Sequence, residues 1–448
     1  MRQLFPPIPS VTAILGPSRA KAADCKLTQF CIRTPCQEGE LMYNTLTGEL
    51  LLLEAGETPE MLREELIEHR FLVPAASDEY AAANQLRTIL RLMNAAKPGV
   101  DHFLIFTTSD CNARCYYCYE LGRTRVPMSD ATAEETADFI LRQSGDREVS
   151  ITWFGGEPLY NRAAIERITA RLREAGKPFY SKMISNGYLF DDETVRTAVQ
   201  DWKLKSVQIP LDGTEEVYNR AKAFIYRDCP SPYQRVLRNI RLLLDAGVRV
   251  SIRLNLGVQN FEDLMALSQE LAVRFAQQKG LYVYTALLQD FGTAPQTAVD
   301  DEERLSRWRK VNKLLRTSGL QRETGLTAKL ALTYCMADRD DFLSVAPDGS
   351  VGKCEHECDH EPVGHIRGGA LDRDLLAAWK EHVQTDACPT CALFPRCLRL
   401  KKCPWAQDGC LPIDREIMRD KIVRQMLYTY EHQNDSSAEV PDSFGDVC

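Results

Sequence analysis

The stretch CNARCYYC, residues 111–118, places the thiols of Cys111, Cys115 and Cys118 within eight residues, directly after a strand-like run from His102 to Thr108. As a helix, this stretch would set its first and last thiols about 10 Å apart along the axis, so a loop is the better prediction. Iron–sulfur clusters are held by cysteine thiolates, commonly four of them. Three close thiols therefore predict a cluster with one iron that lacks a local protein ligand. The alternatives are a zinc site, which needs a fourth Cys or His nearby, or three unrelated buried thiols.

The composition is that of a globular protein that can bury a sizeable core. A chain of 448 residues predicts two or three domains, and 44% hydrophobic and 26% charged residues are ordinary proportions. The net charge of -8 offers no basic footprint for nucleic acid. No apolar run approaches the roughly 18 residues needed to cross a membrane, and the N-terminus is a poor signal peptide. Eleven of the 16 cysteines fall into two dense groups with metal-like spacing, which indicates a cytoplasmic, oxygen-poor compartment.

Strand-like and helix-like patterns alternate from His102 to about residue 320. The strand-like runs after the first are Val149–Phe154, Tyr180–Ser185, Ser206–Leu211, Arg249–Leu256 and Leu281–Leu288. Repeated strand–helix units with right-handed crossovers predict an α/β fold, in which a parallel sheet is covered by helices. In barrels built from such units, chemistry takes place at the carboxyl ends of the strands. Both the cysteine loop and the turn Gly155-Gly156-Glu157-Pro158 directly follow strand-like runs.

The cysteine spacing and the glycine turn resemble motifs of one enzyme family. C-x3-C-x2-C, with the aromatic Tyr117 before the last Cys, is similar to the signature of the radical S-adenosylmethionine (radical SAM) enzymes. The resemblance implies a partial (β/α)6 TIM-type barrel and a [4Fe-4S] cluster whose open iron chelates the amino and carboxylate groups of S-adenosylmethionine. Gly155, Gly156, Glu157 and Pro158 are similar to the family's GGE motif, which holds the amino group of that cofactor. Taken alone, the same turn would more often be structural.

Further side chains at strand ends are candidates for contacts with the cofactor or the substrate. Ser185 follows the third strand-like run and Asp212 follows the fourth, at positions that resemble family positions. A turn-capping role is the competing interpretation for both. Arg253 and Asn255 alternate with apolar neighbours in the fifth run, so both are expected to point inward. Arg253 is a candidate partner for the carboxylate of S-adenosylmethionine, and a structural salt bridge is the alternative.

A second cysteine-rich region resembles the SPASM domain, which carries two auxiliary iron–sulfur clusters. Its cysteines are Cys335, Cys354, Cys388, Cys391, Cys397, Cys403 and Cys410, and Pro347-Asp348-Gly349 supplies the usual hairpin turn. The resemblance implies a first auxiliary cluster on Cys335, Cys354 and Cys403, with Cys358 as a candidate fourth ligand. It implies a second auxiliary cluster on Cys388, Cys391, Cys397 and Cys410. The spacing departs from the family pattern after Cys397, and one or two structural zinc ions are the alternative.

The patterns divide the chain into residues 1–98, 99–325, 326–433 and 434–448. These segments are expected to form a small N-terminal α+β domain, the radical SAM core, the SPASM domain with a last helix over Asp414–His432, and a mobile tail. The first segment contains two strands within Leu41–Leu53 and helices near Thr58–His69 and Ala81–Ala95. It resembles a peptide-recognition domain that holds an extended leader peptide, and a small cap under the barrel is the alternative. Its cysteines are irregularly spaced and are interpreted as idle thiols.

The family resemblance implies a reaction and a class of substrate. Radical SAM enzymes pass one electron to S-adenosylmethionine and use the resulting radical to take a hydrogen atom from a carbon. Enzymes with a SPASM domain usually crosslink or oxidise peptides or proteins, with a flavodoxin or ferredoxin as electron donor. The leading interpretation is a maturase of a ribosomally made peptide, with no nucleic-acid or membrane partner. The alternatives are an anaerobic sulfatase maturase, for which Glu355 is the candidate acid/base, and a non-catalytic iron–sulfur redox protein.

Overall fold

The computed structural model describes residues 1–18, 24–94, 99–275, 278–288, 299–330, 335–356, 360–368, 370–394, 396–397, 399–403 and 410–433. The chain divides into two compact units. The core unit comprises Gly99–Arg322 and Arg339–Trp379. The terminal unit combines Met1–Pro98, Glu323–Asp338 and Lys380–Cys448. The segment boundaries expected from sequence stay a prediction, as does the nature of residues 434–448, which lie outside the described part of the chain.

Six parallel strands form the main sheet of the core unit, and they lie in the order in which they occur in the chain. They are β7 (His102–Thr108), β8 (Val149–Gly155), β9 (Phe179–Ile184), β10 (Leu204–Leu211), β11 (Arg249–Leu256) and β12 (Leu281–Leu287). Each strand pairs in parallel with the next along the chain. The predicted α/β fold with a parallel six-stranded sheet is therefore confirmed, and the predicted strands differ from the observed ones by at most two residues at either end.

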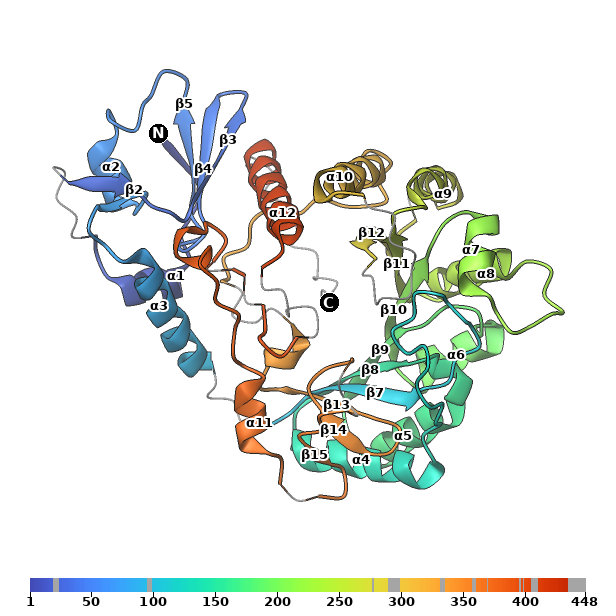
Figure 1. Ribbon diagram of the computed structural model, residues 1–448. Coiled ribbons are helices and arrows are strands. Elements are labelled where there is room, and N and C mark those ends of the chain that lie inside the picture. Colours follow the sequence, from blue (N-terminus) through green and yellow to red (C-terminus); the bar gives the residue numbers. More distant parts are fainter. Residues whose placement is uncertain are drawn as a thin grey trace. The chain divides into compact units, whose positions relative to one another are not determined.

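Helices connect the strands and cover one face of this sheet (Figure 1). They are α4 (Asp130–Ser144), α5 (Arg162–Glu174), α6 (Asp192–Gln200), α7 (Glu215–Lys222), α8 (Pro232–Asp245), α9 (Phe261–Arg274) and α10 (Asp301–Thr317). Several begin at a side chain that accepts a hydrogen bond from the first turn, as Ser129, Asp191 and Ser231 do. The apolar face of α8 is fully buried. Burial of such faces fixes the helices against the sheet.

A short hairpin from the second cysteine-rich region extends the same sheet. Strand β13 (Phe342–Val345) pairs in parallel with β7, and β14 (Ser350–Gly352) and β15 (Gly364–His365) continue the sheet in antiparallel fashion. The turn between β13 and β14 contains Gly349 at a φ of +92°, which favours glycine. The hairpin turn predicted at residues 347–349 is therefore present, and helix α11 (Arg373–Ala378) follows it.

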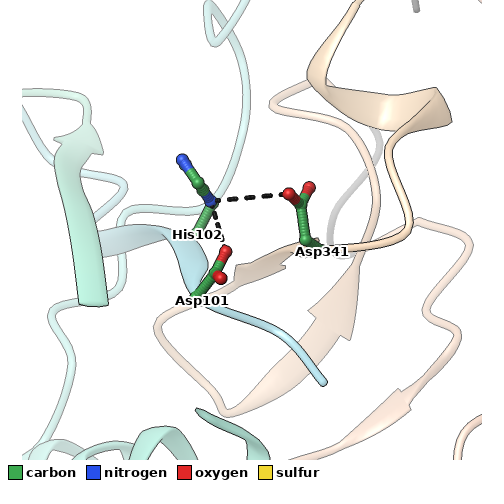
Figure 2. Close-up of side chains that lie close together, drawn as sticks. All are labelled: Asp101, His102 and Asp341. Carbon is green, nitrogen blue, oxygen red and sulfur yellow. Dashed lines mark hydrogen bonds and ion pairs between the residues drawn. The ribbon is translucent and has the colours of Figure 1, made fainter. Parts of the chain in front are cut away.

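An ion-pair network secures the start of β7 against β13. The Nδ1 atom of His102 lies 2.6 Å from Asp101 Oδ1 and 3.9 Å from Asp341 Oδ2 (Figure 2). Each carboxylate also pairs with an arginine, because Arg147 lies 2.9 Å from Asp101 and Arg339 lies 2.8 Å from Asp341. This network lies at the amino ends of the strands. In barrels of this kind, residues at that end contribute to stability, whereas catalytic residues lie at the carboxyl ends. We interpret it as structural.

The terminal unit is built on a four-stranded antiparallel sheet. Its strands lie in the order β1 (Arg2–Phe5), β5 (Leu50–Glu54), β4 (Gly39–Asn44) and β3 (Cys31–Cys36). Around it lie α1 (Pro9–Leu15), β2 (Cys25–Leu27), α2 (Arg63–Glu68), β6 (Leu72–Pro74) and α3 (Glu79–Asn94). The two strands predicted within residues 41–53 are β4 and β5, and the predicted helix over 81–95 is α3. The helix predicted over 58–69 begins only at Arg63, since residues 58–62 form turns.

The last helix of the chain completes the core of this N-terminal sheet. Helix α12 (Pro412–Glu431) corresponds to the helix predicted over 414–432. Its buried residues Ile422 and Met426 share one hydrophobic cluster with Leu41, Leu50 and Leu52 of strands β4 and β5. The N-terminal strands and α12 therefore fold together in the terminal unit. Among the described residues, every helix is too short or too polar to cross a membrane.

Candidate functional site

The cysteine loop lies at the carboxyl end of β7 and contains no helix, as predicted. Two backbone hydrogen bonds attach it to the segment that ends α7. The amide of Arg114 donates to the carbonyl of Lys222 (2.8 Å), and the amide of Ile225 donates to the carbonyl of Asn112 (3.0 Å). The loop is thus held by a part of the chain that is about a hundred residues away in sequence.

The three thiols of the loop are held in a setting that disfavours free thiolates. Burial raises the pKa of Cys111 to about 12 and that of Cys118 to about 11, and it also raises the pKa of Cys115. A bound metal supplies the positive charge that such thiols need to ionise. In a tetrahedral zinc site the sulfurs lie about 3.8 Å apart. Within the described residues, only Asp101, His102 and Asp341 bring three ligand atoms within 4.8 Å of one another. The three cysteine sulfurs of the loop are therefore spread more widely than the sulfurs of a zinc site.

The GGEP turn packs directly on the residues that lead into the cysteine loop. Gly155 has a φ of +125°, and a Cβ atom there would lie 2.1 Å from the carbonyl oxygen of Thr108. A Cβ atom on Gly156 would lie 2.4 Å from the carbonyl oxygen of Asp110. Glycines allow a close approach of the backbone to a ligand. The structure adds that they let it approach the chain itself, and the amide of Glu157 donates to Asp110 (3.0 Å).

The side chain of Glu157 joins the ends of strands β8 and β9. Its carboxylate is fully buried and accepts hydrogen bonds from Ser185 Oγ (2.9 Å), the Asn186 amide (2.8 Å) and the Leu159 amide (3.2 Å). Burial raises the pKa of Glu157 to about 7. Ser185 is therefore brought to the predicted cofactor motif, and the next residue places its side-chain Nδ2 atom 3.8 Å from Cys111 Sγ. Pro158 begins a short 3-10 helix that closes the turn.

Asp212 and Tyr117 meet in a second buried polar group beside the cysteine loop. The Tyr117 hydroxyl donates to Asp212 Oδ1 (2.7 Å), and Asn255 Nδ2 donates to the same oxygen (2.9 Å). The ammonium of Lys222 donates to the Tyr117 hydroxyl (2.7 Å) and lies 3.0 Å from Asp212 Oδ2. Asp212 thus contacts one residue each from the cysteine loop, β11 and α7.

Lys222 was not identified from the sequence. It is the last residue of α7, in a surface-like run of charged residues, and no motif marks it. In the structure only 2% of its side chain is exposed. The sequence gives no sign that Lys222 is buried and paired, because its partners Tyr117 and Asp212 are distant along the chain.

Arg253 provides a test of whether the predicted cofactor fits. It lies on β11 two residues before Asn255, so both side chains project from the same face of the sheet. Its Nε atom is buried and has no hydrogen-bond partner among the described residues. A buried donor without an acceptor is costly, and a ligand carboxylate would satisfy it. The residues present therefore fit a ligand such as S-adenosylmethionine.

Four cysteines of the second region line one pocket in the terminal unit. They are Cys388, Cys391, Cys397 and Cys410, which the family resemblance had assigned to the second auxiliary cluster. Burial raises the pKa of Cys397 and of Cys410. Phe394 also lines the pocket and packs against Tyr80 of α3, with ring centroids 4.5 Å apart. Four cysteines that line one pocket suit a closed cluster site.

The other predicted cysteine ligands do not share a unit. Cys354 is buried in the core unit, whereas Cys335 and Cys403 belong to the terminal unit. Their joint ligation of a first auxiliary cluster stays a prediction. Cys358, the candidate fourth ligand, lies outside the described residues.

Glu355 follows Cys354 and is placed beside the segment that leaves the cysteine loop. Its carboxylate is mostly buried, lies 3.4 Å from His356 Nε2, and leaves Oε2 without a hydrogen-bond partner among the described residues. The ring of Tyr119 packs edge-on against His356, with centroids 4.4 Å apart. Arg123 donates to the carbonyl of His356 (2.7 Å). Glu355 thus lies in the core unit with one carboxylate oxygen that has no hydrogen-bond partner among the described residues. Its role as acid/base stays a prediction.

Comparisons with known proteins agree with this geometry. Residues 105–271 match the Radical SAM superfamily. Over 70 residues the chain is 36% identical to an uncharacterized protein of Methanocaldococcus jannaschii, covering 16% of this chain and 24% of that protein. Over 160 residues it is 25% identical to the Fe-coproporphyrin III synthase of Methanosarcina barkeri, covering 36% of this chain and 38% of the synthase. The chain thus spans well under half the length of these curated relatives.

Solved structures share the fold at low sequence identity. The structure of native anSMEcpe with bound AdoMet has a TM-score of 0.55 and 16% identity, covering 75% of this chain and 100% of that one. Streptococcus suis SuiB bound to the precursor peptide SuiA has a TM-score of 0.51 and 12% identity, covering 86% of this chain and 95% of that one. The matched residues contain five of the six parallel strands and the cysteine loop. This chain therefore contains a radical SAM domain, the domain that in its superfamily uses a [4Fe-4S] cluster and S-adenosylmethionine.

Proposed function

We propose that this chain is a radical SAM maturase that modifies a peptide or protein, by crosslinking or oxidation, after hydrogen-atom abstraction. One observation carries the proposal. The cysteine loop lies at the carboxyl edge of the parallel sheet, beside buried polar groups from successive strand ends, among them Glu157, Asp212 and Asn255. This edge is where enzymes built on parallel sheets place their chemistry. A redox protein that only carries electrons would not need this arrangement.

The chain's own residues have distinct roles in this proposal. Cys111, Cys115 and Cys118 would hold the [4Fe-4S] cluster, which together with S-adenosylmethionine supplies a radical that abstracts a hydrogen atom. Glu157 holds the ends of β8 and β9 together, so that its turn is positioned for the amino group of the cofactor. Arg253, whose Nε atom is buried, would offer its guanidinium to the cofactor carboxylate. The pocket of Cys388, Cys391, Cys397 and Cys410 would hold an auxiliary cluster that accepts an electron from the substrate.

Two observations support a peptide substrate. Solved structures with the same fold contain peptides, namely anSMEcpe with the Cp18Cys peptide and SuiB with the precursor peptide SuiA. In the terminal unit, β1 and β3 form the edges of the described sheet, and an edge strand can bind an extended leader peptide by strand addition. We place the reaction in an oxygen-poor cytoplasm, with a flavodoxin or ferredoxin as electron donor, because the thiols are clustered with metal-like spacing.

A sulfatase maturase is the second candidate, favoured by the likeness to anSMEcpe. Glu355, placed directly after Cys354, would then act as the base that takes a proton from the substrate side chain. The two candidates differ in substrate. A precursor peptide would be crosslinked or oxidised at several side-chain types, whereas a sulfatase-derived peptide would be oxidised at one Cys or Ser.

The test begins with anaerobic purification and reconstitution with iron and sulfide, followed by dithionite and S-adenosylmethionine. We expect formation of 5'-deoxyadenosine by the wild-type chain and none by Cys115→Ala. Protein with confirmed clusters that forms no 5'-deoxyadenosine would contradict the proposal. Mass spectrometry of a co-expressed precursor peptide, compared with a sulfatase-derived peptide that carries Ser at the modified position, then identifies the substrate as the one that loses two mass units per event.

A further inference from the structure

The ammonium of Lys222 is buried and is surrounded by aromatic rings and polar groups. Its ammonium lies 5.4 Å from the ring centroid of Tyr117 and 5.8 Å from that of Tyr218, which is one helical turn earlier. It donates to the Tyr117 hydroxyl and is paired with Asp212 at 3.0 Å, with side-chain exposures of 2% and 4% for the lysine and the aspartate. Two rings, one hydroxyl and one carboxylate therefore surround it. Such a site keeps a lysine charged although it is buried.

The same lysine is attached to the cysteine loop by its backbone. The carbonyl of Lys222 accepts from the amide of Arg114, which lies between Cys111 and Cys115. Ala223 then adopts a left-handed conformation with a φ of +43°, so α7 ends here and the chain turns along the loop. Backbone and side chain together hold the ammonium beside the thiols. Burial raises the pKa of Cys115, while the ammonium of Lys222 acts to lower it and the carboxylate of Asp212 acts to raise it.

We propose that Lys222 tunes the iron–sulfur cluster of the cysteine loop, by stabilising its reduced form and thereby raising its reduction potential. This inference rests on the proposed function. One-electron reduction by a low-potential donor adds one negative charge to a cluster that three thiolates already make anionic. A fixed positive charge in a water-poor site lowers the free energy of the more negative state. Asp212 acts in the opposite sense, and Glu157, also fully buried, is the second carboxylate that interacts with the lysine.

The experiment is an EPR-monitored redox titration of the reconstituted full-length protein. The cluster of the cysteine loop is recognised by the change of its signal when S-adenosylmethionine is added, and any auxiliary clusters in the same sample serve as an internal control. For Lys222→Met we expect an at least tenfold lower ratio of reduced to oxidised cluster at a given potential. For a one-electron couple this is a shift of about 59 mV to lower potential. Lys222→Arg keeps the charge and should remain close to the wild type.

Asp212→Asn is the decisive companion variant, because it should shift the potential upward. Opposite shifts on the two sides of one ion pair cannot arise from a general loss of structure. If Lys222→Met fails to fold because Asp212 is left unpaired, the double variant Lys222→Met/Asp212→Asn, without a buried charge, should fold and titrate between the single variants. Unchanged potentials in Lys222→Met and Asp212→Asn, with clusters bound, would overturn the inference. A wild-type protein that binds no cluster would instead overturn the proposed function.

Discussion

The two cysteine sites of this chain differ in what surrounds the thiols. The loop in the core unit has three thiols, and its neighbours include the buried charged residues Glu157, Asp212 and Lys222. The pocket in the terminal unit has four thiols, and apolar side chains such as Leu393 and Phe394 form much of its lining. Four thiolates complete the ligand set of a cluster, whereas three leave a position open, as in catalytic metal sites. Under the proposed function, this difference would separate a site that binds and activates a ligand from one that holds a cluster for electron transfer.

The largest expected effect comes from removing one thiol from each site. Cys115→Ala should abolish 5'-deoxyadenosine formation, because the open cluster loses one of only three ligands. Cys391→Ala should lower the iron content and prevent product formation, but leave cleavage of S-adenosylmethionine measurable. Iron analysis and chromatography of the nucleoside check both outcomes, with Cys25→Ala as a control. Equal loss of cleavage in both variants would show that the two sites do not act separately.

A second variant tests whether the close packing around the loop is needed. Gly155→Ala introduces a methyl group 2.1 Å from the Thr108 carbonyl oxygen at a φ of +125°. We expect a loss of about 4 kcal/mol in the free energy of unfolding and poor cluster incorporation at the loop alone. Gly176→Ala is the matched control, because Gly176 has a φ of +66° and no atom within 4 Å of the added methyl group. It should cost about 1 kcal/mol and leave iron content unchanged. Thermal unfolding and iron analysis distinguish the two.

A third prediction concerns pH and uses the buried carboxyl of the core site. Burial raises the pKa of Glu157 from 4.5 to about 7 in the folded chain. The folded state therefore favours the protonated form, so the contribution of Glu157 to stability is complete below pH 4.5 and is lost as the pH rises to about 7. Relative to the wild type, Glu157→Gln should become more stable by about 3 kcal/mol between pH 4.5 and pH 8. Denaturant unfolding of iron-free protein at both pH values checks this, and a constant difference would contradict it.

The smallest effect is expected away from both cysteine sites. Asp341→Asn weakens the ion pairs at the start of β13, where the aspartate and its partner Arg339 are each 36% exposed. Exposed pairs contribute about 0–1 kcal/mol, so stability should fall by no more than that. Iron content and cleavage of S-adenosylmethionine should remain those of the wild type. A loss of cleavage in this variant would show that the network at the amino ends of the strands supports the loop.

The sequence alone determined the parallel sheet and most of the elements around the loop. The apolar runs of β7 and β11 appear in the sequence with the observed ends, because a buried strand is a local pattern. The thiol spacing and the turn at residues 155–158 are local as well, and so they identified the radical SAM domain before any fold was known. Cys388, Cys391 and Cys397 likewise line one pocket, and the resemblance to the SPASM domain had assigned them to one site.

Only the tertiary structure placed Lys222 beside Tyr117, 105 residues away, and Asn255 beside Asp212, 43 residues away. Only the tertiary structure joined α12 to the N-terminal strands in one hydrophobic cluster. The reason is physical. A lysine at the end of an amphipathic helix has the same local pattern whether its ammonium meets water or a buried carboxylate, and contacts between distant segments leave no periodicity in either of them.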